Sequence, residues 1–247
     1  MVRLSVNVNK VATLRNARGG SNPSVIEAAR VCVEAGAHGI TVHPRPDERH
    51  IRYHDVRDLA DTLTVELNIE GYPSPEFLDL VCDVRPAQCT LVPDPPDVLT
   101  SNAGWDLRDG GTSLPTDRAA TVDLGDVLTR LKTAGIRTSL FMDPDTDQIA
   151  RAAALGADRI ELYTMDYAEA FPTARDRAVE PYRHAAVFAG ERGLGINAGH
   201  DLDVHNLPYL VANLPGLLEV SIGHALIADA LYRGLGPTVA AYLAALR

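Results

Sequence analysis

The chain has 247 residues, 46% of them hydrophobic, with 19 Gly and 16 Pro, a composition that excludes disordered and collagen-like proteins. Its formal net charge of -10 at pH 7 argues against a nucleic-acid-binding surface, which requires clustered Lys and Arg. No apolar run approaches the ~18 residues of a membrane span, and the N-terminus enters a predicted strand without a signal-peptide pattern, so we expect a cytoplasmic protein. The three cysteines, Cys32, Cys82 and Cys89, lack metal-site spacing and are predicted to be free thiols.

Short apolar segments alternate with amphipathic segments along the chain. Strands are predicted at residues 4–8, 39–43, 66–70, 89–93, 138–142, 159–163, 195–198 and 219–222. Helices are predicted at 24–36, 55–63, 75–84, 125–135, 145–156, 182–193 and 204–214, and two more within 223–247, split at 234–237. Several helices end in Gly, the usual left-handed residue before a turn into the next strand.

Eight strand–helix units predict an α/β fold, a (β/α)8 TIM barrel in which residues 1–247 form a single domain with extra helices at the C-terminus. The length fits the ~250 residues typical of this barrel. The alternative is an open doubly wound sheet, which normally has fewer units and carries a Gly-rich phosphate loop after its first strand. Here the first strand is followed by Asn9 and Lys10 instead, so the barrel is favoured.

Residues 94–123 form a long segment rich in Pro, Gly, Asp and Thr after the fourth predicted strand. In a barrel this segment lies on the catalytic side, where catalytic groups come from the carboxyl ends of the strands. A loop of this length is typically a lid or binding loop, or is partly disordered.

Several predicted strands end at a proton-transfer side chain. His43 follows 39-GITV-42, Glu70 closes 67-LNIE-70, and His200 and His224 follow strands seven and eight. An acid at the end of a buried strand is costly unless it is paired or used, and burial raises its pKa toward the range of a general base. A structural ion pair is the alternative for Glu70.

Two segments favour binding of phosphate groups. Residues 43–55 hold Arg45, Arg49, His50 and Arg52, which suit an anion even though each alone could be a solvated loop charge. Residues 13–20 supply Arg15 and Arg18 beside a Gly pair. The loops after strands seven and eight commonly bind phosphate through backbone N–H groups in this fold.

The segments 5-SVNVNKVATLRNARGG-20, 39-GITVHPRPDERHI-51, 68-NIEGY-72, 197-NAGHDL-202 and 221-SIGHALI-227 together resemble the pyridoxine 5′-phosphate synthase family. The resemblance covers nearly the whole chain. It implies a TIM barrel in a homo-octamer, a tetramer of dimers, without metal or organic cofactor. It also implies condensation of 1-deoxy-D-xylulose 5-phosphate with 3-amino-2-oxopropyl phosphate, which releases phosphate and water and closes the pyridine ring of vitamin B6.

The resemblance also implies a role for individual residues. His43 and Glu70 would be the general bases and His200 the proton donor. The residues implied to hold the aminoketone phosphate are Asn7, Arg18, Asp201, Gly223 and His224. The residues implied to hold the deoxyxylulose phosphate are Asn9, Lys10, Arg45, His50 and Thr100.

The chain departs from the commoner family pattern on its first strand, where Asn9-Lys10 replaces Asp-His. The change removes a carboxylate and replaces an imidazole with an ammonium, which can pair with a phosphate as a point charge. Asp201 also stands where Gly is frequent, and a backbone phosphate contact survives there if the carboxylate points away.

Two alternatives belong to other functional classes. One is a metal-dependent barrel hydrolase with His43, Glu70 and His200 as ligands, although the first strand lacks the His-x-His that such barrels often carry. The other is a phosphosugar-binding or regulatory barrel without catalysis, against which the presence of all three proton-transfer residues argues.

Overall fold

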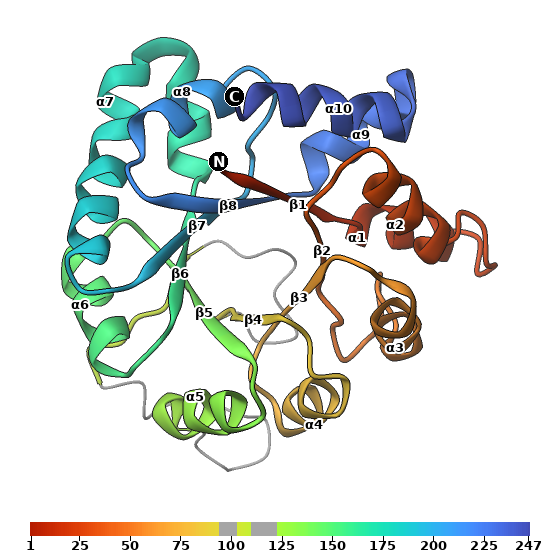
Figure 1. Ribbon diagram of the computed structural model, residues 1–247, viewed down its shortest axis with the longest axis horizontal. Coiled ribbons are helices and arrows are strands. Elements are labelled where there is room, and N and C mark those ends of the chain that lie inside the picture. Colours follow the sequence, from red (N-terminus) through yellow and green to blue (C-terminus); the bar gives the residue numbers. More distant parts are fainter. Residues whose placement is uncertain (94–102, 110–122) are drawn as a thin grey trace.

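Eight parallel strands close into a barrel in which each strand pairs with the next and β8 returns to β1 (Figure 1). The computed structural model describes residues 1–93, 103–109 and 123–247. The predicted (β/α)8 TIM barrel is confirmed, and every predicted strand overlaps an observed one. The strands are β1 Arg3–Asn7, β2 Gly39–Val42, β3 Glu66–Gly71, β4 Gln88–Leu91, β5 Arg137–Met142, β6 Arg159–Tyr163, β7 Gly195–Gly199 and β8 Leu217–Ile222.

Helices surround the barrel, and α9 and α10 pack together beside β8 and β1 (Figure 1). None of the helices within the described ranges is long and apolar enough to cross a membrane. The helices are α1 Asn9–Asn16, α2 Val25–Glu34, α3 Tyr53–Thr62, α4 Pro75–Val84, α5 Leu124–Thr133, α6 Thr146–Ala154, α7 Met165–Gly190, α8 Leu207–Asn213, α9 His224–Arg233 and α10 Leu235–Ala245.

Local sequence signals explain where most helices begin and end. The Ser24 and Ser74 side chains accept the N–H groups of Glu27 and Phe77 and so cap α2 and α4. After α2, α5 and α6 the predicted Gly turns adopt positive φ, for example +102° at Gly36. The corresponding position after α4 is Arg85, with φ +52°.

Two helical segments differ from the prediction. Residues 9–16 form α1, a helix that is not among the predicted ones, and no side chain caps its start at Val8. The helix predicted at 182–193 begins at Met165, because α7 continues through Pro172 and Pro181 with a kink at Ala174. Proline interrupts the helical pattern in the sequence, so the first half of α7 is concealed.

The interior of the barrel is polar. Alternate strand residues such as Leu4, Ile40 and Ile69 are fully buried against the helices, and the residues between them face the barrel axis. Side-chain hydrogen bonds among the inward residues join β1 to β2, β2 to β3 and β3 to β4. Two further bonds run along β4 and across the barrel from β7 to β4. The members of this polar layer are Ser5, Thr41, Asn68, Thr90, Gln88 and Asn197.

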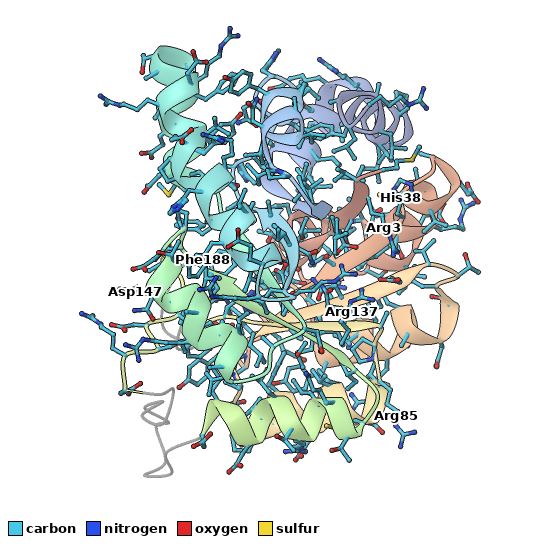
Figure 2. The ribbon with its side chains drawn as sticks, turned by 60° about the vertical axis from the view of Figure 1, so that its left-hand side comes forward. Arg3, His38, Arg85, Arg137, Asp147 and Phe188 are labelled. Atoms are coloured by element: carbon cyan, nitrogen blue, oxygen red, sulfur yellow. The ribbon has the colours of Figure 1, made fainter. Side chains whose placement is uncertain are left out.

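A salt-bridge network, which we call the floor, lies at the amino ends of the strands. The carboxylate of Glu66 accepts Nη1 of Arg3 at 2.7 Å and Nη2 of Arg137 at 2.5 Å. Nη2 of Arg3 donates to the carbonyl of His38 at 3.1 Å. Figure 2 labels Arg3, His38 and Arg137, which lie on one side of the barrel. The floor ties β1, β3 and β5 together below the polar layer.

Candidate active site

The three predicted proton-transfer residues lie at the carboxyl ends of parallel strands, which we call the rim. His43 follows β2 directly, Glu70 is the penultimate residue of β3, and His200 follows β7. Because all eight strands are parallel, these ends share one mouth of the barrel. The charge of His200 also contributes to lowering the pKa of His43, which requires the two imidazoles to be close in space.

Glu70 is a buried carboxyl group without a cation partner in the part of the chain that the structure describes. Its Oε2 accepts Nδ2 of Asn7 at 3.3 Å, and its Oε1 accepts the Ser221 hydroxyl at 3.4 Å. Burial raises the pKa of Glu70 to about 7, and the nearby Glu219 adds to this rise. The carboxyl can therefore take up and release a proton near neutral pH, and no cation among the described residues forms the ion pair that was the alternative for Glu70.

His43 is held through its backbone by the segment that leads from β1 into α1. Its N–H donates to Oδ1 of Asn9 at 2.9 Å, and the N–H of Asn9 in turn donates to Oδ1 of Asn7 at 3.0 Å. Since Asn7 also bonds Glu70, hydrogen bonds through Asn7 and Asn9 link the Glu70 carboxyl to the backbone of His43. Burial lowers the pKa of His43 well below 6.5, and Arg45 and His50 lower it further, so its imidazole is neutral at pH 7.

His200 lies in an aromatic environment on the opposite side of the mouth. Its ring centroid lies 4.9 Å from that of Phe141 and 5.2 Å from that of Tyr163. Its backbone has φ +78°, and Asp201 follows with φ +56°. The ring is thus placed by a left-handed turn at the end of β7.

The predicted deoxyxylulose phosphate set is largely brought together. Burial lowers the pKa of His50 to about 4, and Arg45 and Lys10 contribute, so their positive charges are near its ring. The His50 ring lies 5.9 Å from that of His43. Asn9 joins this group through His43. Thr100 lies outside the described residues.

The predicted aminoketone phosphate set is brought together in part. A Cβ at Gly223 would come within 3.1 Å of the Asn7 side chain, and Gly223 precedes α9, which begins at His224. The N-terminus of α9 therefore opens at the rim, where backbone N–H groups favour an anion. Asp201 follows His200, whereas Arg18 is exposed in the turn after α1, without a side-chain bond to the described residues.

The prediction that Arg15 binds phosphate is wrong. Arg15 is only 3% exposed, and its Nη1 and Nη2 donate to the two carboxylate oxygens of Asp55 at 2.6 and 2.9 Å. Nη2 also donates to the carbonyl of His50 at 3.0 Å. Because residues 9–16 form a helix, Arg15 faces α3 and supports the loop that carries His50.

A family model described as "Pyridoxal phosphate biosynthesis protein PdxJ" matches residues 4–247. The chain belongs to the PdxJ family. It is 55% identical over 247 residues to "Pyridoxine 5'-phosphate synthase" of Phocaeicola vulgatus, covering all of both chains. It is 56% identical over 248 residues to the protein of the same name from Bacteroides fragilis, again covering both completely. The family resemblance of the motifs is thereby confirmed.

Solved structures of other proteins share the fold of this PdxJ family member. Tryptophan synthase from M. tuberculosis superposes with a TM-score of 0.66 at 12% identity, covering 100% of this chain and 92% of that one. Phosphoribosylanthranilate isomerase from Thermotoga maritima gives 0.61 at 15% identity, covering 100% and 98%. At these identities the likeness concerns the barrel alone.

Sequence reasoning missed Glu161, a second buried carboxyl group of this family member. Glu161 is 2% exposed on β6, and its Oε2 has no hydrogen-bond partner among the described residues. Burial raises the pKa of Glu161 well above 4.5, and Glu70 and Glu219 raise it further. A signal was present, because an acid interrupts the apolar strand R-I-E-L-Y just as Glu70 closes L-N-I-E.

The metal-hydrolase alternative requires three ligating side chains around one point. Within residues 1–93, 103–109 and 123–247, no group of three His, Cys, Asp or Glu side chains is arranged to hold a metal ion. His43, Glu70 and His200 therefore do not form the ligand set which that alternative needs.

Proposed function

We propose that this protein is a pyridoxine 5′-phosphate synthase that condenses 3-amino-2-oxopropyl phosphate with 1-deoxy-D-xylulose 5-phosphate. The full-length identity of about 55% to relatives of that name carries the proposal. The arrangement of His43, Glu70 and His200 at one mouth supports it. The products are pyridoxine 5′-phosphate, inorganic phosphate and water, and the atoms balance without an oxidant or reductant.

The chemistry needs positioned proton carriers rather than a strong electrophile. One substrate supplies the amine and both supply carbonyl carbons, so ring closure proceeds by carbinolamine dehydration, enolisation, phosphate loss and an aldol step. Each of these steps moves a proton, and a group with pKa near the working pH moves it fastest. The pKa of Glu70, about 7, matches this requirement.

The two bases and the donor have distinct environments. His43 is neutral at pH 7 because burial and nearby cations lower its pKa, so its imidazole can accept a proton. Glu70 can both accept and return one. His200 would donate to departing oxygen from the opposite side of the mouth. Burial raises the pKa of Glu161 well above 4.5, so this carboxyl would be a second group able to hold or supply a proton near Glu70.

The two phosphate groups would bind on different strands of the rim. Asn9, Lys10, Arg45 and His50, with Thr100, would hold the deoxyxylulose phosphate. The N-terminus of α9 at Gly223 and His224, with Asn7, Arg18 and Asp201, would hold the aminoketone phosphate. Localised cations of this kind explain how a chain of net charge -10 binds two anionic substrates.

Lys10 provides a separate test of the first phosphate site. If its ammonium pairs with the deoxyxylulose phosphate, Lys10→Met should raise KM for that substrate about tenfold and change KM for the aminoketone phosphate little. Steady-state kinetics with each substrate varied in turn measures both. An unchanged KM for the deoxyxylulose phosphate would exclude the pairing.

We further propose a homo-octamer, a tetramer of dimers, located in the cytoplasm. Leu231 and Tyr232 on α9 are 70% and 92% exposed, and Leu14 on α1 is 54% exposed, so apolar side chains are available for subunit contacts. Light scattering after size exclusion measures the assembly. A monomer in wild-type protein would contradict this state.

Phosphate release tests the activity directly. Purified protein should release inorganic phosphate and form a pyridine absorbance only when both substrates are present together. A barrel that binds phosphosugars without catalysis would give neither signal, and titration calorimetry would still show binding. His200→Ala, which removes the proposed donor, serves as the inactive reference.

A further inference from the structure

The turn that carries His200 is conformationally unfavourable. His200 and Asp201 have φ of +78° and +56°, and they are consecutive residues with a Cβ in the left-handed region. That region costs about 1–2 kcal/mol for each such residue. The turn therefore needs tertiary contacts to hold it, and these contacts can be identified.

Thr164, the residue between β6 and α7, binds the turn from below. Its hydroxyl oxygen lies 2.7 Å from the carbonyl oxygen of Gly199 and 2.5 Å from that of His200. Its backbone N–H donates to the Gly199 carbonyl at 3.0 Å. Successive carbonyls of an extended strand point in opposite directions, so the two carbonyls meet at one hydroxyl because the backbone leaves the extended conformation at His200, where φ is +78°.

The next carbonyl is bound from the other side. Nδ2 of Asn206 donates to the carbonyl of Asp201 at 3.0 Å. Asn206 is fixed in turn, since its N–H donates to Asp203 at 2.9 Å and its carbonyl accepts the Tyr167 hydroxyl at 2.7 Å. Three consecutive carbonyls, those of residues 199–201, are thus bound by buried side chains.

We propose that Thr164 is a positioning residue, whose hydroxyl holds the β7 turn left-handed and so aims the His200 imidazole at the substrate. The inference rests on the proposed function, in which His200 is the proton donor. Thr164 is fully buried and is not among the residues placed at either phosphate site. Its effect reaches the reaction through the direction of the His200 ring, which Phe141 and Tyr163 confine.

Thr164→Val removes the hydroxyl and keeps the volume, and Thr164→Ser keeps the hydroxyl. In Thr164→Val the His200 carbonyl loses the hydroxyl donor, whereas the Gly199 carbonyl keeps the backbone N–H of residue 164, so the turn can relax at His200 toward an extended conformation. We expect kcat to fall about 10- to 100-fold in Thr164→Val and to stay within about threefold of wild type in Thr164→Ser. KM for the deoxyxylulose phosphate should change less than about threefold, because the residues proposed to hold it lie after β1 and β2. KM for the aminoketone phosphate should rise, because Asp201 belongs to the same turn as His200.

Thr138→Val is the matched control, because it deletes a buried hydroxyl at the opposite end of the barrel. The hydroxyl of Thr138, on β5, donates to the carboxylate of Asp158 at 2.7 Å. Loss of this hydrogen bond should lower Tm and leave kcat unchanged. If Thr164→Val keeps the wild-type kcat, or if Thr138→Val loses as much turnover, the positioning role is overturned. The alkaline limb of the pH profile, which reports the donor, should shift only in Thr164→Val.

A crystal structure of Thr164→Val separates this inference from the proposed function. A φ at His200 that has relaxed toward the extended region supports the positioning role of Thr164. Failure of the wild-type enzyme to convert the two substrates would contradict only the proposed function. A φ that stays near +78° in the variant overturns the inference, whatever the activity.

Discussion

Glu66 and Glu70 lie on the same strand, both face the barrel interior, and their pKa values move in opposite directions. Burial acts to raise the pKa of Glu66, but bonds from Arg137 and Arg3 outweigh it, so the pKa is lowered. At Glu70 burial acts without an opposing cation and raises the pKa to about 7. Four residues along β3 therefore separate a structural carboxylate from one suited to proton transfer.

The difference in pKa between Glu66 and Glu70 depends on the partners of each carboxylate more than on its position along β3. A carboxylate with two guanidiniums stabilises the fold and has little capacity for chemistry, whereas a buried carboxyl without a cation is unfavourable for folding and available for catalysis. A glutamate in the floor network is therefore structural, whereas a glutamate at the rim is available for proton transfer. The polar layer between them, which includes Asn68 on β3, separates the two environments by hydrogen bonds rather than charge.

The largest expected effect is the loss of turnover in Glu70→Gln. The amide keeps the shape of the side chain but cannot accept a proton, so kcat should fall about 10³-fold, the range for removal of a general base. Glu66→Gln is the matched control on the same strand. It should keep kcat and lose about 1–3 kcal/mol of stability, because two guanidiniums lose a charged partner.

Phosphate-release kinetics and urea unfolding of both variants measure these outcomes. Equal losses of kcat in the two variants would mean that the floor contributes to catalysis, and the contrast along β3 would then be wrong. Unfolding should be compared at one protein concentration, since subunit association changes the apparent stability.

Asp55 shows whether the partner or the position decides. It lies near the rim, yet its carboxylate bonds Arg15 through both oxygens, and the pair is almost fully buried. Asp55→Asn leaves Arg15 buried without a counter-charge and should cost about 3–5 kcal/mol of unfolding free energy. Removal of both charges in Arg15→Met/Asp55→Leu should cost less than Asp55→Asn alone. A loss below about 1 kcal/mol in Asp55→Asn would contradict a structural pair.

The barrel and the main bases could be predicted from the sequence because their signals are local. A β-branched run that ends in His or Glu, and a Gly after a helix, depend on neighbouring residues only. The role of Arg15 could not be predicted, since its partner Asp55 is 40 positions away. The sequence did not reveal α1, because that helix has no capping side chain. It did not reveal Glu161 either, because an acid in the middle of a strand is a weaker signal of a site than an acid at the strand's end.

The pH dependence of stability should have opposite signs for the two acids of β3. The folded-state pKa of Glu70, about 7, is above the ordinary 4.5, so its contribution is full below 4.5 and is lost as pH rises through 7. Relative to wild type, Glu70→Gln should therefore gain about 3 kcal/mol between pH 4.5 and 8.

Glu66 has a lowered folded-state pKa, so its contribution is present above 4.5 and is lost as pH falls. Glu66→Gln should thus be most destabilised, relative to wild type, at the higher pH. Urea unfolding at pH 4.5 and pH 8 measures both differences. Parallel pH profiles for the two variants would mean that both acids have the same partners in solution.

The smallest effect concerns left-handed residues, which also differ between the two ends of the barrel. At the rim, side chains bind the carbonyls of residues 199–201. At the amino-terminal end of the barrel, Arg85 has φ +52° and is exposed, and its side chain makes no bond within the described residues. Arg85→Gly removes the left-handed penalty of about 1–2 kcal/mol and adds backbone entropy to the unfolded chain, so a net gain of about 0.5–1 kcal/mol is expected. Arg85→Ala keeps the Cβ and should change stability by less than about 0.5 kcal/mol. Turnover should be unchanged in both. If Arg85→Gly were less stable than Arg85→Ala, the left-handed backbone at residue 85 would carry no net penalty for a residue with a Cβ, and the strain argued for this end of the barrel would be wrong.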